Sequence, residues 1–258
     1  MRLIDTHCHL YDAPLAGDLE GVLHRARAAG VEAMVVVGTT LETSRQAVHL
    51  ASTFPDVWAA VGLHPDAEEP LDLAALAGLL AHARVVAVGE IGLDGSRGKD
   101  RLAAQEPLCR AQLVLARNHG LPALVHSRDA TGRLLRLLGE LGPGGPGGIL
   151  HAYAGSREVA TGLIDLGFHL GVSGVVCRPQ ATRVRGVLAA LPLSALVLET
   201  DAPFIGTASR PPGQVEPAQV REVCHALAEL HAVPADTVAA TTTATARRLL
   251  RFTSASGV

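Results

Sequence analysis

Eight short apolar runs recur along the chain, and each is followed by a longer stretch whose apolar residues fall at helical spacing. The runs begin near residues 3, 32, 57, 85, 121, 147, 168 and 195, and read LIDTHCHL, EAMVVVG, VWAAVGLH, VVAVGEIGLD, LPALVHS, GGILHAY, FHLGVSG and ALVLETDAP. Nearly continuous hydrophobic character is typical of strands that are covered on both faces. A parallel sheet connected by crossover helices requires this alternation.

Helices are predicted between and after these runs. Residues 18–30, DLEGVLHRARAAG, have apolar residues at helical spacing and end at Gly30, a residue type that commonly terminates helices. The same pattern predicts helices over 71–83, 101–119, 129–141, 157–166, 216–231 and 235–251. The segment PGGPGG at 143–148 looks the most flexible, but it is too short to link two domains and only precedes the sixth run.

The length of the chain selects between two α/β architectures. The chain has 258 residues, of which 48% are hydrophobic, and this is enough for one large core. Eight strand and helix alternations in a chain of this size match one barrel, whereas a doubly wound sheet normally uses fewer strands. We therefore expect a TIM (β/α)8 barrel that spans residues 1–258 as one domain.

The charge balance limits the partners that the whole surface can attract. The net charge is −3 and charged residues make up 18% of the chain, so no strong general attraction to nucleic acid or to an anionic membrane is expected. Aromatic residues make up only 3%, which argues against a long surface on which bases stack. A polyanionic substrate would have to be bound locally.

The cysteines and the N-terminal segment bear on location. Cys8, Cys109, Cys177 and Cys224 are scattered and form no Cys-x-x-Cys pair, so neither a disulfide framework nor a thiolate zinc site is expected. The apolar stretch at the start is too short for a signal peptide, and no run of about 18 apolar residues occurs. These features predict a cytoplasmic, reducing location and no membrane partner.

The first run ends in His7-Cys8-His9. Side chains at positions i and i+2 of a strand point to the same face, so these two imidazoles can converge on one metal ion. The alternative is a pair of hydrogen-bonded interior histidines. Asp5 lies two residues earlier on the same face and would either support the histidines as a partner behind the ligands or make a structural hydrogen bond.

Four further residues able to bind a metal lie near the ends of other runs: Glu90, His126, His151 and Asp201. The carboxyl ends of the strands of a barrel meet at one rim, where active sites of this fold are built. Four histidines and two carboxylates suit two divalent ions such as zinc or manganese, whereas magnesium more usually takes oxygen ligands. Six unrelated buried polar groups are the alternative, and isolated buried charges are costly.

Seven stretches, in this order, resemble the TatD family of metal-dependent hydrolases over nearly the whole chain: DTHCHL, VGLHP, VGEIGLD, QLVLARNHGLPALVHSRDA, GGILHAYAG, LGFHLGVSG and LVLETDAPF. The resemblance implies a TIM-like barrel, two divalent metal ions (Zn, Mn or Mg) and hydrolysis of phosphodiester bonds in DNA. The implied activity is often that of a 3′–5′ exonuclease, with single strands or DNA ends as substrate.

The resemblance also assigns the six candidate ligands to two ions: His7, His9 and Asp201 to one, His126 and His151 to the other, and Glu90 to both. Two such cations would lower the pKa of a bound water and stabilise the charge that grows on the attacked phosphate. Glu90 and Asp201 are thus the expected catalytic carboxylates. Asp201 would orient the water or accept its proton, or would serve only as a ligand.

Three more residues are candidates for supporting roles. Arg128, in HSRD, is expected to contact a phosphate oxygen, or alternatively to form a salt bridge with Asp129 or a glutamate. His64, in GLHP, is expected to bind the substrate or its leaving group, or to have no functional role. Glu199 precedes Asp201 by two residues and would either support the ligands from behind or be a core carboxylate bonded to the backbone.

Departures from the family pattern fall on the substrate side. Residues 95–97 are Gly-Ser-Arg where relatives commonly carry aromatic residues after GLD, and residues 209–212 are Ser-Arg-Pro-Pro in place of His-Arg-Gly-Lys. Tyr153 replaces the aromatic of a His-Cys-Phe motif, and Thr245 replaces an Asn of the closing helix. Two other functions therefore stay open: an amidohydrolase-type hydrolase of a small phosphoester, lactone or amide, and a catalytically silent barrel that acts as a binding subunit. The sequence does not indicate whether accessory subunits exist.

Overall fold

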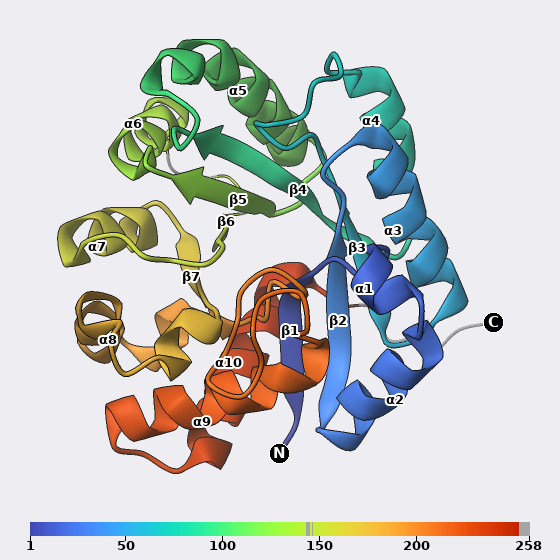
Figure 1. Cartoon of the computed structure of the whole chain (residues 1–258). Coiled ribbons are helices and arrows are strands. Elements are labelled where there is room, and N and C mark those ends of the chain that lie inside the picture. The colour runs from blue at the N-terminus through green and yellow to red at the C-terminus, as the bar shows by residue number, and fades with distance from the viewer. Residues whose placement is uncertain (143–144, 146, 253–258) are drawn as a thin grey trace.

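The computed structural model describes residues 1–142, 145 and 147–252. Eight parallel strands follow one another in chain order around the molecule (Figure 1). The strands are β1 (Leu3–Cys8), β2 (Val31–Val37), β3 (Val57–Val61), β4 (Val85–Asp94), β5 (Ala123–Arg128), β6 (Gly148–Leu150), β7 (Phe168–Val172) and β8 (Leu196–Leu198). Each of the eight apolar runs supplies one strand. The expected TIM (β/α)8 barrel is confirmed.

The barrel closes between its first strand and the segment that follows β8. Two backbone hydrogen bonds join them: Asp201 N–H donates to the His7 carbonyl and His9 N–H donates to the Ala202 carbonyl, each over 2.8 Å. An isolated parallel bridge pairs Cys8 with Ala202. This seam brings the start and the end of the barrel together at the residues that the sequence singles out as metal ligands.

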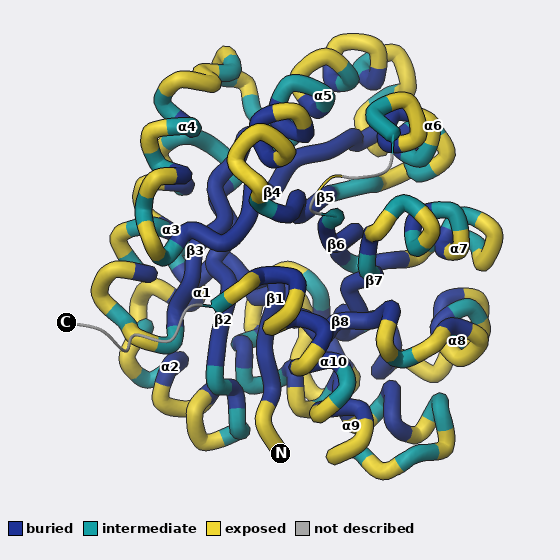
Figure 2. Tube along the Cα trace, turned by 180° about the vertical axis from the view of Figure 1, so that it is seen from behind, coloured by how far each residue is buried: buried dark blue, intermediate teal, exposed yellow. Residues whose placement is uncertain are grey.

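Helices surround the strands, as Figures 1 and 2 show. They are α1 (Ala13–Ala16), α2 (Leu19–Ala28), α3 (Leu41–Thr53), α4 (Leu73–Leu80), α5 (Leu102–Asn118), α6 (Thr131–Leu141), α7 (Arg157–Asp165), α8 (Thr182–Ala189), α9 (Val220–His231) and α10 (Ala235–Leu250). Short 3-10 turns cover Lys99–Arg101, Gly174–Cys177, Leu193–Ala195 and Pro217–Gln219. No helix in the described part of the chain is both long enough and apolar enough to cross a membrane.

The helices expected from the sequence all form, with ends displaced by a few residues. Gly30 follows α2 with φ of +90°, and a Cβ there would come within 2.7 Å of the Met1 carbonyl, so this position needs a glycine. Two further helices, α3 and α8, were not predicted from the sequence pattern. Of the glycine- and proline-rich segment 143–148, residues 143, 144 and 146 lie outside the described residues.

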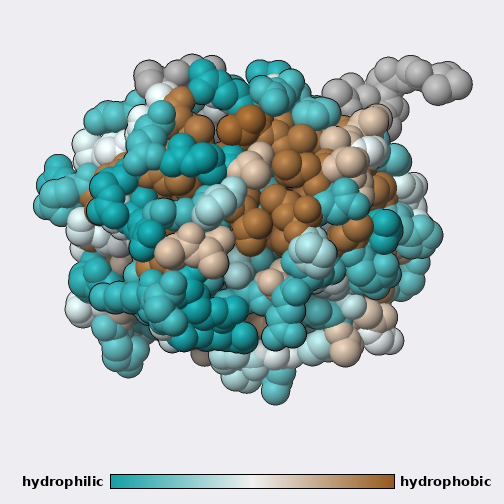
Figure 3. Space-filling view, turned by 90° about the horizontal axis from the view of Figure 1, so that it is seen from above, coloured by the Kyte–Doolittle hydropathy of each residue, from teal (hydrophilic) through white to brown (hydrophobic). Residues whose placement is uncertain are grey.

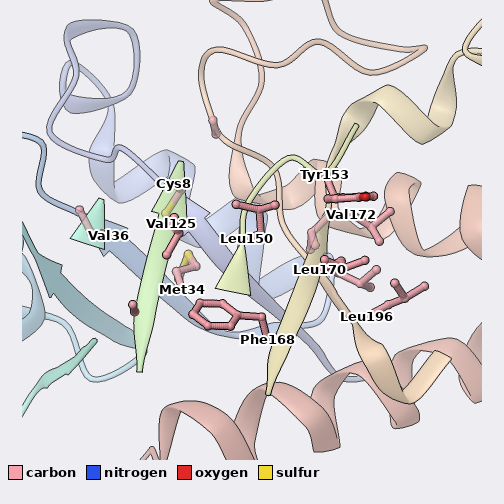
Figure 4. Close-up of a cluster of buried hydrophobic side chains, with 14 of the residues drawn as sticks. Cys8, Met34, Val36, Val125, Leu150, Tyr153, Phe168, Leu170, Val172 and Leu196 are labelled. Atoms are coloured by element: carbon pink, nitrogen blue, oxygen red, sulfur yellow. The ribbon is translucent and has the colours of Figure 1, made fainter. Parts of the chain in front are cut away.

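Neighbouring strand residues face opposite sides and build two apolar clusters. Met34 and Val36 belong to the larger one, in which side chains of successive strands pack with the surrounding helices (Figure 4). Val35 and Val37 belong to the smaller one, which collects residues from around the barrel together with the end of α10. The period of two along each strand therefore separates the barrel interior from the layer beneath the helices. The strands are correspondingly buried on both faces (Figure 2).

Seen from the side on which α4 and α5 lie, charged and polar side chains surround a group of apolar ones (Figure 3). Leu73 on α4 and Leu108 and Val114 on α5 are large apolar residues that are exposed. Much of the surface of folded proteins is apolar, and we assign no function to these three residues.

Asp5 holds the seam of the barrel. Its carboxylate accepts hydrogen bonds from the hydroxyl and the backbone N–H of Thr200, and from the backbone N–H of His7 at 3.3 Å. Burial raises the pKa of Asp5 to about 8, although these hydrogen bonds act in the opposite direction. The Thr200 hydroxyl also accepts from Ala202 N–H. One buried side-chain pair thus ties β1 to the chain after β8.

Replacing Thr200 with Val should lower the free energy of unfolding by about 1–3 kcal/mol, because the buried carboxyl group of Asp5 and the buried N–H of Ala202 each lose a partner. Urea unfolding measures this change, with an unaltered m value as the sign that the folded state is intact. Thr161→Val is the matched control, since Thr161 is exposed on α7 and its hydroxyl bonds only to the carbonyl of Arg157. Equal losses in the two variants would contradict a special role for this pair.

Candidate metal centre

The six candidate ligands converge on one site, and five of them lie at or just beyond the carboxyl ends of strands. His7 and His126 belong to β1 and β5, and Glu90 lies within β4. The remaining three follow strands directly or closely: His9 after β1, His151 after β6 and Asp201 after β8. The side chains are buried, apart from that of His126, which is partly exposed. The rim predicted from the sequence therefore forms.

The alternation of strand residues explains why the histidines face inward. Leu124 and Ile149 belong to the smaller apolar cluster inside the barrel. His126 and His151 follow them by two residues, so they lie on the same face, one layer closer to the rim. In β4 the pairing shifts between Val88 and Ile91, and Glu90 lies in this irregular stretch.

One group of donor atoms is formed by His7, His9 and Asp201. Nε2 of His9 is 3.2 Å from Oδ1 of Asp201, and Nε2 of His7 is 3.5 Å from the same oxygen. The two imidazole nitrogens are 3.2 Å apart. Three donor atoms from the two sides of the barrel seam thus point at a common position.

Glu90 lies between this group and the other histidines. Its Oε1 is 2.9 Å from Nε2 of His151 and 3.1 Å from Nδ1 of His126. Its Oε2 is 3.4 Å from Nε2 of His7 and 3.9 Å from Nε2 of His9. The two oxygens of one carboxylate therefore face the two halves of the cluster.

His9 and His126 each donate a hydrogen bond from the ring nitrogen that points away from the centre. The other ring nitrogen of each faces carboxylate oxygens. The Tyr11 hydroxyl donates to the Val37 carbonyl and lies 2.9 Å from Nδ1 of His9, so it accepts the proton on that nitrogen. Asp94 accepts in the same way from Nε2 of His126 at 2.8 Å. Nε2 of His9 and Nδ1 of His126 then present lone pairs to carboxylate oxygens unless a proton or a cation lies between them.

These contacts fit divalent cations. Pairs of imidazole nitrogens 3.1 and 3.2 Å apart, next to two carboxylates, are nitrogen and oxygen donors of the kind that zinc and manganese take. Nδ1 of His7 and Nδ1 of His151 are buried and have no hydrogen-bond partner among the described residues. A cation at the centre would compensate the buried carboxylates, which otherwise depend on protonated imidazoles.

The carboxylates and imidazoles of the centre shift one another's pKa: against the effect of burial, neighbouring carboxylates raise the pKa of His9, His126 and His151. Burial alone would raise the pKa of Glu90, but the imidazoles of His151 and His7 hold it well below its usual value. Burial likewise opposes ionisation of Asp201, and the hydrogen bond from His9 lowers its pKa. Burial lowers the pKa of His7, and the neighbouring His151 adds to this effect. Both carboxylates are therefore ionised at neutral pH and attract cations.

Asp94 and Tyr11 are the contacts that the sequence interpretation missed. Each lies close in sequence to a candidate ligand, Asp94 in GEIGLD and Tyr11 two residues beyond His9. Aspartate at the carboxyl end of a strand was the available signal for Asp94. The sequence gives little indication of the contact between Tyr11 and His9, because the orientation of the Tyr11 hydroxyl depends on the Val37 carbonyl of the neighbouring strand.

Three further residues were expected at the site, and they differ in how they contact the candidate ligands. His64 faces the centre, with Nε2 3.7 Å from Oε1 of Glu90, and burial lowers its pKa to about 4. Glu199 is fully buried, bonds to the backbone N–H of Ala152 and lies 3.6 Å from Nδ1 of His151. Asp5 contacts backbone N–H groups at the seam and no imidazole ring.

Arg128 is exposed and points into a neighbouring cleft rather than into the pocket over the candidate ligands. Among the described residues no carboxylate lies within ion-pair distance of it. The salt bridge with Asp129 or a glutamate, the alternative role considered for Arg128, is therefore not formed among these residues, and the guanidinium is available to a ligand. Asp129 has φ of +53°, as does Asp201, so the backbone is strained at this rim.

The pocket over the candidate ligands has a volume of about 390 Å³. It is lined by His9, Thr39, Thr40, His64, Asp66, Ala67, Glu90, His126, His151, Asp201 and Phe204. Phe204 is 54% exposed, and its ring lies 5.1 Å from that of His9. Phe204 was not predicted as a site residue from the sequence, and it follows Asp201 in a turn in which its N–H donates to the Asp201 carbonyl.

The divergent positions have structural partners. Ser209 and the neighbouring Thr207 donate hydrogen bonds to the carboxylate of Glu222, which fixes the loop after β8. The hydroxyl of Thr245 donates to the Ser194 carbonyl. Tyr153 is buried. The loop after β8 is thus held in place by the carboxylate of Glu222.

Comparisons with known proteins point to one family. A family model described as TatD related DNase matches residues 4–251. An uncharacterized metal-dependent hydrolase of Bacillus subtilis, YabD, is 37% identical over 254 residues, 97% of this chain and 99% of its own. A protein of Edwardsiella piscicida named 3′-5′ ssDNA/RNA exonuclease TatD is 38% identical over 208 residues, 79% of this chain and 80% of its own.

Solved structures agree with this grouping. The crystal structure of YJJV, a TatD homologue from Escherichia coli K12, superposes with a TM-score of 0.89 at 37% identity and covers 98% of this chain and 99% of that one. A TatD family hydrolase of Entamoeba histolytica, 20% identical, has a TM-score of 0.83 and covers 97% and 98%. The second likeness concerns the fold alone.

Replacing Asp94 with Ala should weaken metal binding about 10- to 100-fold, because His126 loses the group that orients its ring. Titration of metal-free protein with Mn²⁺ by calorimetry measures the affinity. Asp100→Ala is the matched control, since it removes an exposed carboxylate only a few residues away. An affinity unchanged in Asp94→Ala, or lowered equally in both variants, would contradict this role.

Proposed function

The chain belongs to the TatD family of metal-dependent hydrolases, and from this we propose that it hydrolyses the phosphodiester bonds of single-stranded DNA as a 3′–5′ exonuclease. The observation that carries the proposal is the convergence of four imidazoles and two carboxylates in an open pocket at the rim of the barrel. The name of the Edwardsiella piscicida relative supports the choice of substrate.

We propose two divalent ions, zinc or manganese in preference to magnesium. The assignment follows the donor groups: His7, His9 and Asp201 for one ion, His126 and His151 for the other, and Glu90 for both. When bound, such a pair of ions supplies an activated water and stabilises the charge that grows on the phosphate. His64 belongs to a third group of donors, with Glu90 and His126, and is available as a further ligand or as a substrate contact.

The two carboxylates differ in what they can do. Glu90 is held among imidazoles, and only 5% of its side chain is exposed. Asp201 is 11% exposed, and its Oδ1 is the atom that faces His7 and His9. Asp201 is therefore the better placed to orient the attacking water and accept its proton, whereas Glu90 holds its position.

Phe204 supports a nucleic acid over a small ester as substrate. Its exposed ring stands at the edge of the pocket, against His9, and an exposed aromatic face can stack on a base. Small esters need no such surface. A cytoplasmic location is part of the proposal, since Cys8, Cys109, Cys177 and Cys224 are all unpaired and buried.

Purified protein with Mn²⁺ should shorten a labelled single-stranded oligonucleotide from its 3′ end, and excess chelator should abolish the activity. Glu90→Gln should lower kcat/KM at least about a hundredfold, because the carboxylate that faces both groups of donors is lost. Glu229→Gln, on the exposed face of α9, is the control. The assay is electrophoresis of 5′-labelled products.

A panel of small phosphodiesters, lactones and amides separates the alternative hydrolase from the nuclease. If one of these compounds were hydrolysed faster than any oligonucleotide, the substrate would be a small molecule of that class and not DNA. If no substrate of either kind were turned over and no metal bound, the barrel would be a binding subunit.

Phe204→Ala should raise KM for the oligonucleotide about 5- to 150-fold, as expected from the loss of about 1–3 kcal/mol of base stacking. Phe204→Tyr should restore the parent value, because it keeps the aromatic face. The KM for bis(4-nitrophenyl) phosphate, which carries no nucleobase, is measured for the same variants as the reference for effects other than stacking. A similar rise with both substrates would mean that Phe204 shapes the pocket and does not stack on a base.

A further inference from the structure

A second cleft adjoins the pocket of the metal centre. Its volume is about 650 Å³, within the usual range of ligand sites, and it lies between the ends of β5 and β6 and the loop after β4. His151 lines both this cleft and the pocket over the candidate ligands. A chain molecule bound at the centre can therefore continue into the cleft.

The cleft is lined by cations that have no acidic partner. Lys99, Arg128 and Arg183 all contribute to its walls, and none forms an ion pair with a carboxylate in the part of the chain that the structure describes. Among the described residues, the one hydrogen-bond acceptor of the Arg183 side chain is the carbonyl of Ala154. The fourth cation of the lining, Arg133, is neutralised by Glu106.

Backbone N–H groups reinforce this positive charge. The first residues of α6, Thr131 and Gly132, line the cleft, and Ala130 at the N-cap position provides no side-chain hydrogen bond to them. Helix α7 next to it is capped by the hydroxyl of Ser156. The amino end of α6 is therefore open to an anion, in a cleft where free cations already gather.

The chemistry of the cleft suits phosphate rather than a base. Its aromatic residue, Tyr153, is buried, and its hydroxyl donates to the Ser156 carbonyl. Asp129 is the only carboxylate among the lining residues. We propose that the cleft binds a backbone phosphate of the nucleic-acid strand other than the one that is hydrolysed. This inference rests on the proposed nuclease function and names the path of its substrate.

Ring contacts give the direction of that path. Phe204 lies against His9, His9 against His7, and the His7 ring stacks on that of His151 at 4.1 Å, next to the cleft. The exposed aromatic and the cationic cleft therefore lie at the two ends of this row. A strand would place a base on Phe204, a phosphate at the centre and a further phosphate in the cleft.

The test is binding of a fluorescein-labelled twelve-residue oligothymidylate with phosphorothioate linkages, which keep the charge but resist cleavage. With Mn²⁺ present, fluorescence anisotropy is followed between 50 and 200 mM salt. Lys99→Ala/Arg128→Ala should raise Kd roughly tenfold, and the slope of log K against log salt should fall in magnitude by about 1.4, or about 0.7 for each lost contact. Both side chains are exposed, so folding should be unaffected.

Arg136→Ala/Arg221→Ala is the matched control, because it removes the same charge from exposed helix positions that do not line the cleft. It should leave Kd and the slope unchanged. Equal effects in the two variants, an unchanged slope in Lys99→Ala/Arg128→Ala, or no binding by the parent protein would overturn the proposal. Binding that depends on Lys99 and Arg128 without any cleavage would support the cleft and refute the exonuclease.

Discussion

The carboxylate of Glu90 is a negative charge buried at the end of a barrel whose interior below it is apolar. Removing such a charge from water is costly, and the cost is offset only by opposite charges or by hydrogen bonds from its surroundings. Here the surroundings are imidazoles, two of which are held by Tyr11 and Asp94 with their outer nitrogens occupied. The arrangement is stable when cations or protons lie between the donor atoms, and this is why we interpret the cluster as a metal centre.

The need to accommodate buried carboxylates also determines residue types in the neighbouring backbone. Gly89, which precedes Glu90, leaves room for β5, since a Cβ there would lie 2.6 Å from the Leu124 carbonyl. A Cβ on Gly171 would lie 2.1 Å from Oε2 of Glu199, so this glycine makes space for a second buried carboxylate behind His151. The pair of Asp5 and Thr200 closes the barrel where Asp201 must meet the histidines of β1. Packing and site geometry are therefore parts of one arrangement.

The sequence predicted the barrel and the convergence of the six ligands because both follow from periodicity. Strand residues two apart share a face, and parallel strands end at one rim, so His126 and His151 had to meet near β1 once the fold was recognised. The contacts of Tyr11 and Asp5 could not be predicted, because they depend on which backbone groups lie opposite across the barrel. Arg128 was expected to contact a phosphate oxygen, and the structure places it in the adjoining cleft, next to the start of α6. Local sequence does not determine such directions.

The central claim is that these six side chains hold two divalent ions. An anomalous-difference map from a crystal of the protein grown with Mn²⁺ tests it most directly. We predict two peaks, each about 2.0–2.2 Å from imidazole nitrogens or carboxylate oxygens of the cluster, with Glu90 contacting both. A map with no peak among these residues, in crystals where the metal is bound elsewhere or not at all, would contradict the account.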